Sequence, residues 1–159
     1  MAINCKKSCC LRVGSRCDAV CGNIVSTSGQ VIAWVTEMRY LGVYVTQSKT
    51  FECSLEHAKH SFYRAANAVF AKVGRVASEE VTLHLFKSKC LPVLLYGPEV
   101  YPLVKSQISS LDFAVNCFFM KLFNTSSIEI IKACQSYFSF ELPSVIIPKR
   151  VHKFIRKFK

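Results

Sequence analysis

The pattern of apolar and polar residues changes near residue 53. Before it, short runs of strand-forming residues are separated by turn residues; the runs are 9–13, 24–25, 31–35 and 39–45. After it, apolar residues recur at intervals of three and four, as on helices that bury one face. The pattern therefore predicts an α+β chain, with a small antiparallel sheet in the N-terminal third followed by a bundle of about four to five helices.

Two segments of the N-terminal third indicate how its strands are connected. Residues 26–30 read STSGQ, which is typical of a hairpin turn in which Gly29 supplies a positive φ. The run 39–45, RYLGVYV, is interpreted as a strand in which Gly42 forms a bulge or lets another backbone approach closely. A sheet with so few strands cannot bury both of its faces by itself. We therefore expect an unpaired edge strand and one face of the sheet packed on the helices or on a partner.

The first helix is predicted from a stripe of apolar residues at helical spacing. The stripe consists of Leu55, Ala58, Phe62, Ala65, Val69 and Val73. Ser54 is a suitable N-cap and Gly74 a suitable residue just past the end. Basic residues lie off the stripe, namely Lys59, Arg64, Lys72 and Arg75. The helix is therefore expected to present its cations to solvent.

A second helix is predicted to start after Ser78, where two glutamates favour the first turn of a helix. It is expected to bury Val81, Leu85 and Phe86. Pro92 lacks a backbone N–H, so it must kink or end this helix.

Further helices are predicted over roughly 106–123 and 127–138, and a last basic helix from Ser144 or Pro148 onward. Three regions follow from these boundaries. Residues 1–53 hold the strands, residues 54–143 form the helical region, and residues 144–159 form a basic C-terminal helix or tail.

The chain has 159 residues and a net charge of +11, and its cations gather at the C-terminal end. Six Lys and Arg, together with His152, lie within 149–159, where no acid occurs. This excess predicts a polyanionic partner. Nucleic acid is favoured over an anionic membrane because basic residues recur on the earlier helices, interleaved with Phe and Tyr that can stack on bases or sugars.

Hydropathy and cysteine content indicate an intracellular protein, in the nucleus or the cytoplasm, without a membrane span. The longest apolar run, 90–96, contains Pro92 and is far shorter than a bilayer requires. No apolar segment follows the first basic residues, as a secretory signal would need. The nine cysteines are therefore expected to be reduced thiols.

Cysteine chemistry is a weaker interpretation of the same residues. The early cysteines, at 5, 9, 10, 17 and 21, have CxxxC spacings rather than CxxC pairs and lack a nearby His, so their spacing does not favour zinc. A cysteine nucleophile paired with His57, His60 or His84 is not favoured either, because nothing nearby supplies a base and an orienting group. No metal site is predicted.

Several short segments follow one another in a specific order along nearly the whole chain. They are NCKKS (4–8), the Gly-bearing hairpin, RYLGV (39–43), SFYRAAN (61–67), LPVLLYG (91–97) and NCFFMK (116–121). In this order and spacing they resemble the C-terminal portion, the end of the palm plus the thumb, of the reverse transcriptase of non-LTR (LINE-type) retrotransposons. The helical region is then thumb-like, and residues 1–53 hold palm-end strands and a primer-grip-like hairpin.

The resemblance implies roles for particular residues. In that family the lysine of Asn-x-x-Lys-Ser, here Lys7 with Lys6 as its neighbour, assists departure of pyrophosphate as a general acid. The RYLGV segment is similar to the element that positions the primer end, which implies primer contacts from Arg39, Tyr40 and Gly42. Phosphates of the template–primer duplex are expected to contact Lys59, Arg64, Lys72, Arg75, Lys149, Arg150, Lys153, Arg156 and Lys157.

The chain departs from that family because the metal-binding aspartates lie upstream of the Asn-x-x-Lys-Ser segment. Its only aspartates, Asp18 and Asp112, are far apart in sequence, whereas two-metal phosphoryl transfer needs clustered carboxylates. The complete family enzyme uses Mg²⁺, but we expect no cofactor in this chain and no DNA synthesis by it alone. It is interpreted as a fragment of an RNA-directed DNA polymerase.

The expected partners are an RNA or DNA template–primer duplex and the missing palm and fingers region. The alternative is a protein-interaction or structural module with no nucleic-acid role, whose apolar sheet face awaits another chain. Salt separates the two hypotheses, because phosphate binding weakens steeply with salt and an apolar interface does not.

Overall fold

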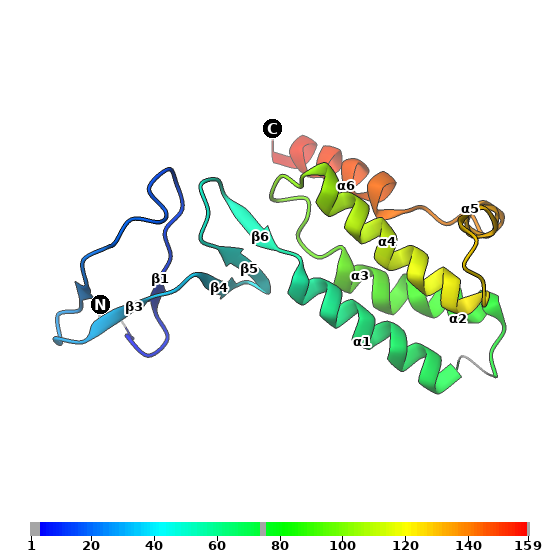
Figure 1. Ribbon diagram of the computed structural model, residues 1–159, viewed down its shortest axis with the longest axis horizontal. Helices are drawn as coiled ribbons and strands as arrows, with labels where there is room; N and C mark the ends of the chain where they lie inside the picture. The colour runs from blue at the N-terminus through cyan, green and yellow to red at the C-terminus, as the bar shows by residue number, and fades with distance from the viewer. Residues whose placement is uncertain (1–3, 74–75, 159) are drawn as a thin grey trace. The chain divides into compact units, whose positions relative to one another are not determined.

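The computed structural model describes residues 4–73 and 76–158 and has the α+β fold that the sequence predicts (Figure 1). The chain divides into two compact units, Met1–Ser54 and Leu55–Lys159. The described strands belong to the first unit and the described helices to the second. Gly74 and Arg75, expected past the end of the first helix, lie outside the described residues.

The first sheet is mixed and has the strand order β1-β3-β2. Its strands are β1 (Cys9–Cys10), β2 (Ile24–Val25) and β3 (Val31–Trp34). β2 and β3 form the predicted hairpin, with Gly29 at φ 77° and its N–H donating to the Ser26 carbonyl at 2.9 Å. β1 pairs with β3 in parallel, so the expectation of a single antiparallel sheet was wrong in this detail.

The second sheet is antiparallel and has the strand order β4-β5-β6. Its strands are β4 (Glu37–Tyr40), β5 (Val43–Thr46) and β6 (Glu52–Ser54). The prediction of one strand over 39–45 was wrong, because Tyr40 pairs with Val43 across a two-residue turn. Leu41 has φ 47° and Gly42 has φ 85°, and two-residue hairpin loops of type I′ require positive φ at both central positions.

The first unit buries few side chains. Among its described residues the buried apolar ones are Cys17, Ile32 and Cys53. Polar contacts hold its loops instead: the Gln47 amide donates to the Cys17 carbonyl at 2.6 Å, and Trp34 Nε1 donates to the Gly22 carbonyl at 3.1 Å. The unit therefore gains little stability from apolar burial.

The second unit is a bundle of helices. In chain order they are α1 (Glu56–Val73), α2 (Glu79–Leu85), the π-helical segment η1 (Phe86–Cys90), α3 (Leu91–Leu94), α4 (Lys105–Leu122), α5 (Ile128–Tyr137) and α6 (Pro143–Phe158). The Ser78 side chain accepts from the Val81 N–H at 3.5 Å at the start of α2, as its N-cap position predicts. α4 contacts both α1 and α6.

The predicted inward face of α1 is largely correct, and that of α2 is only partly so. Leu55, which directly precedes α1, and Phe62 of α1 are buried. On α2, however, Val81 is 50% exposed, whereas Thr82 and Leu83 are buried. Phe86, which was also expected to face inward, is fully buried and Leu85 is half-buried, so Val81 is the predicted inward residue that faces solvent instead.

Pro92 does not end the helical path that begins at α2. The backbone widens into the π-helical segment η1 just before the proline, and helical geometry continues through α3. Proline cannot donate the i to i−4 backbone hydrogen bond of an α-helix. The wider π-helical turn accommodates this missing hydrogen bond, so the helical path continues past Pro92.

Aromatic rings form the centre of the helical core. Phe86 is fully buried and stacks on Phe118 with ring centroids 3.7 Å apart. Phe62 meets Phe86 edge-on at 5.6 Å, and Phe140 meets Phe119 at 4.9 Å. These rings come from α1, η1, α4 and the segment before α6, so they join the helices around one centre.

Candidate nucleic-acid interface

α6 is strongly amphipathic, and the residues of its apolar stripe become more exposed to solvent toward the C-terminal end. Pro143 and Ile147 are buried, Val151 and Phe154 are half-buried, and Phe158 is 71% exposed. These positions recur at intervals of three and four and therefore share one face. The other faces of the helix carry its cations, and the described part of the helix contains no acid.

Two of the α6 cations are already engaged within the second unit. Lys149 forms an ion pair with Glu141, and the Arg150 guanidinium donates to the Leu95 carbonyl at 2.9 Å. The remaining described cations of the helix, Lys153, Arg156 and Lys157, are exposed. Their ammonium and guanidinium groups are available to an external anion. We call these three residues the α6 basic end.

α1 presents a second, smaller basic surface. Arg64 and Lys72 are both exposed and lie within about 80° of each other around the helix axis at 3.6 residues per turn. Lys59 lies about 140° from Arg64 on the same count. The predicted set on this helix is therefore split. Arg64 and Lys72 share one face, which we call the α1 basic face, and Lys59 lies on another.

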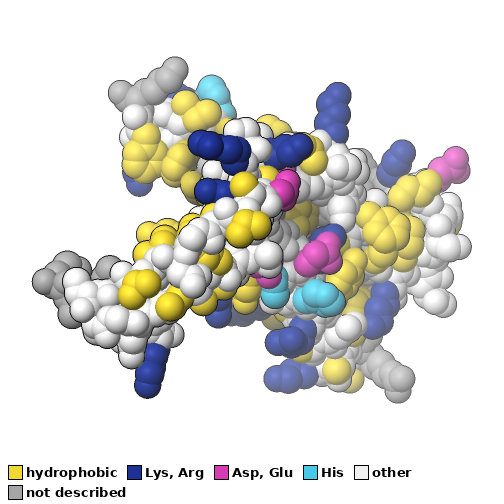
Figure 2. Space-filling model, turned by 60° about the vertical axis from the view of Figure 1, so that its left-hand side comes forward, with side chains coloured by type: hydrophobic (Ala, Val, Ile, Leu, Met, Phe, Trp, Pro, Cys, Tyr) yellow, Lys and Arg dark blue, Asp and Glu magenta, His cyan; other side chains and the backbone are white. Residues whose placement is uncertain are grey.

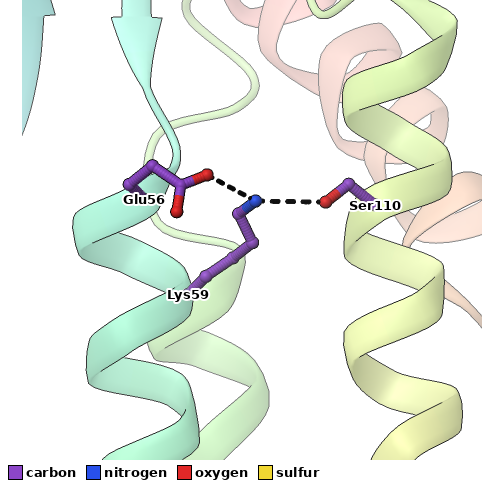
Figure 3. A network of polar contacts seen from close by, with 3 residues as sticks. All are labelled: Glu56, Lys59 and Ser110. Carbon is purple, nitrogen blue, oxygen red and sulfur yellow. Dashed lines mark hydrogen bonds and ion pairs between the residues drawn. The ribbon is translucent and has the colours of Figure 1, made fainter.

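Lys59 turns toward α4. Its ammonium group lies 2.6 Å from Glu56 Oε1 and donates to Ser110 Oγ at 3.1 Å (Figure 3). The Lys59 side chain is 21% exposed and that of Glu56 is 69% exposed. The hydrogen bond and charge of Lys59 lower the pKa of Glu56. Lys59 is thus a partly buried cation with two partners, which its residue type alone could not reveal.

The α1 basic face and the α6 basic end are separate surfaces. α4 contacts both helices and lies between them in Figure 1. On the face shown in Figure 2, Lys and Arg side chains stand in several places with apolar side chains between them. The two basic surfaces therefore lie at different points of the bundle.

Sequence reasoning missed the cations that contact aromatic rings of other segments. Lys121 donates to Asn67 Oδ1 at 3.0 Å and lies 4.7 Å from the centre of the Phe70 ring. Lys87 lies 5.3 Å from the centre of the Phe140 ring and donates to the Phe138 carbonyl. Lys121 falls within the NCFFMK segment, yet its partners are far away in sequence and leave no local signal.

The predicted site residues of the first unit lie on its surface. Lys7 is exposed, and its N–H closes a turn with the Asn4 carbonyl at 3.0 Å. Arg39 is exposed and lies 5.9 Å from the centre of the Tyr44 ring, which it faces across the β4–β5 pair. Tyr40 and Gly42 are exposed at the end of that hairpin. The hairpin therefore offers a cation, a phenol and open backbone at one place.

Within residues 4–73 and 76–158, no group of three His, Cys, Asp or Glu side chains is placed to hold a metal ion. The described helices include none that is long and apolar enough to cross a bilayer. Among the described residues, no cysteine is joined to another in a disulfide. Burial raises the pKa of Cys53, Cys90 and Cys117.

Comparison of the chain with protein-family models, with curated proteins and with solved structures gave no significant match. The resemblance to a non-LTR retrotransposon reverse transcriptase therefore stays a prediction from the segments quoted above.

Proposed function

We propose that the helical unit binds the phosphate backbone of a nucleic-acid duplex without reading its sequence. In this proposal the chain is part of a non-LTR retrotransposon reverse transcriptase and contributes to template–primer binding. Phosphate contacts fix a protein on a duplex but carry no sequence information, so cations on a rigid helix are sufficient for this role.

The α6 basic end is the observation that supports the proposal best. Lys153, Arg156 and Lys157 are exposed on a helix whose described residues include no acid, and its first turns are anchored by buried Pro143 and Ile147. Fixed cations release counterions from a phosphate backbone without first breaking internal ion pairs. Lys149 is different, because its ion pair with Glu141 must be exchanged before it can bind a phosphate.

The experiment compares two triple charge reversals that alter the net charge equally. Lys153→Glu, Arg156→Glu and Lys157→Glu together remove the α6 basic end. Lys89→Glu, Lys105→Glu and Lys132→Glu together reverse three exposed lysines of η1, α4 and α5. Affinity for a labelled RNA–DNA hybrid is measured by fluorescence anisotropy over a series of salt concentrations, with circular dichroism as the check on folding.

The wild-type chain should bind hybrids of different sequence equally, with an affinity that falls steeply as salt rises. The first triple variant should bind far more weakly, and the slope of log affinity against log salt should fall by about 3, or roughly one for each phosphate that is no longer neutralised. The second triple variant should retain most of that slope. Equal losses of affinity in both variants would mean that net charge alone attracts the duplex, and the proposal would be wrong.

The α1 basic face is tested separately with Arg64→Glu combined with Lys72→Glu. If this face contacts the same duplex, the salt slope should fall by about 2. An unchanged affinity would restrict the interface to α6.

A second function, that of a protein-interaction module, is favoured by the first unit. Its described residues include exposed apolar side chains on the β2–β3 hairpin, at Ile24, Val25 and Val31, above a very small core. Apolar side chains open to water at a sheet mark a surface for another chain. Folded protein that fails to bind the hybrid at low salt, yet self-associates regardless of salt, would favour this function over the first.

A further inference from the structure

A shallow hollow of about 220 Å³ lies between α1 and α4, next to the Lys59 network of Figure 3. Its lining combines donors and aromatic rings, and consists of Glu56, Lys59, His60, Tyr63, Ser110 and Phe113. It does not coincide with the α1 basic face or the α6 basic end. The interface proposed above gives it no role.

The ammonium group of Lys59 is held in place by α4, whereas its anionic partner is not. Ser110 Oγ accepts from Lys59 at 3.1 Å across the helix pair, and only 21% of the lysine side chain is exposed. Glu56 is the first residue of α1 and is 69% exposed. An exposed carboxylate contributes little through such a pair, so an external anion can displace it at low cost.

The donors around the hollow suit an oxyanion with several acceptor atoms. A lysine ammonium carries three N–H donors, and two of those of Lys59 have described partners. The Ser110 oxygen accepts from Lys59, which leaves its own O–H to donate. The Tyr63 phenol is a hydrogen-bond donor at neutral pH, and burial raises its pKa above the ordinary value.

Two aromatic rings complete the lining. Tyr63 is 39% exposed and Phe113 is 60% exposed, although both lie on helices that pack on the apolar core. Rings that stand open beside a fixed cation suit a ligand that carries a planar group next to its charge.

We propose that this hollow binds a phosphate group carried on a nucleoside, with Glu56 occupying the phosphate position when no ligand is present. Lys59 and Ser110 hold the phosphate, and Tyr63 and Phe113 contact the attached sugar or base. The phosphate belongs either to a free nucleotide or to a nucleic-acid strand. The inference rests on the proposed function only if the phosphate belongs to a nucleic-acid strand.

The test uses adenosine 5′-monophosphate and the RNA–DNA hybrid as separate probes. Binding is followed by the NMR shifts of the Lys59 and Ser110 amides in the full chain. Glu56→Gln removes the competing carboxylate without changing its shape, so affinity should rise several-fold. Glu141→Gln is the matched control, because it makes the same charge change at the exposed Glu141–Lys149 pair. Lys59→Met should abolish binding, and Ser110→Ala should weaken it several-fold.

A nucleotide site is identified if Glu56→Gln binds the mononucleotide more tightly than the wild type does and Glu141→Gln does not. The same pattern with the hybrid but not the mononucleotide identifies a backbone phosphate. Equal effects of Glu56→Gln and Glu141→Gln, or undiminished binding by both Lys59→Met and Ser110→Ala, would overturn the inference. The α6 triple variant should lose hybrid binding but keep mononucleotide binding. Failure of this site and failure of the α6 interface are therefore distinguishable.

Discussion

Replacement of Phe86 by alanine should strongly destabilise the helical unit. The ring is fully buried, stacks on Phe118 at 3.7 Å and meets Phe62 at 5.6 Å. Truncation of a buried phenylalanine costs about 3–5 kcal/mol through reduced burial and the cavity left behind. Domains of this size are stable by only about 5–15 kcal/mol. Phe86→Ala should therefore remove about half of the free energy of unfolding of this unit.

Urea unfolding followed by far-UV circular dichroism measures the effect, because the described helices all belong to the second unit. Phe86→Leu keeps an apolar side chain and should cost about 1 kcal/mol or more, because leucine cannot stack on the neighbouring rings. Val81→Ala is the control on the same helical path, and its 50% exposed side chain should cost less than about 0.5 kcal/mol. Equal costs for Phe86→Ala and Val81→Ala would refute the described inward face.

Two further predictions concern the turn and the thiols. Leu41→Asn should stabilise the first unit by about 1 kcal/mol, because asparagine tolerates the positive φ that leucine adopts at this turn. Thermal unfolding measures this change in stability. A loss of stability would contradict the two-residue hairpin. Cys90 is buried and its raised pKa leaves less thiolate at a given pH, so iodoacetamide should alkylate exposed Cys9 first and Cys90 only at higher pH or after unfolding. Mass spectrometry of timed samples checks this order, and early labelling of Cys90 would contradict its burial.

The predictions that were confirmed depend on local chemistry. Gly29 permits the turn between β2 and β3, and Ser78 caps α2, because both effects act within a few residues. The strand predicted over 39–45 was wrong because strand propensity concealed the turn. Tyr40 and Val43 favour strands, and nothing in Leu41 signals a positive φ.

The candidate site was harder to predict because its geometry depends on contacts that are distant in sequence. Lys59 has the same residue type and helical setting as Lys72, yet it bonds to Ser110, which lies 51 positions away. Arg150 likewise donates to the Leu95 carbonyl, which lies 55 positions away. A charge count predicts how many cations a helix carries, but only packing decides which of them remain available to a partner.

The exposed end of the α6 stripe has a consequence for handling the chain with polyanions. Ile155 and Phe158 are exposed on the same last turns as Lys153, Arg156 and Lys157, so mutual repulsion between these cations keeps the apolar side chains of neighbouring molecules apart. A bound polyanion cancels that repulsion and leaves the apolar side chains free to meet. Mixtures near charge balance therefore favour precipitation, whereas an excess of either component keeps the complexes dispersed.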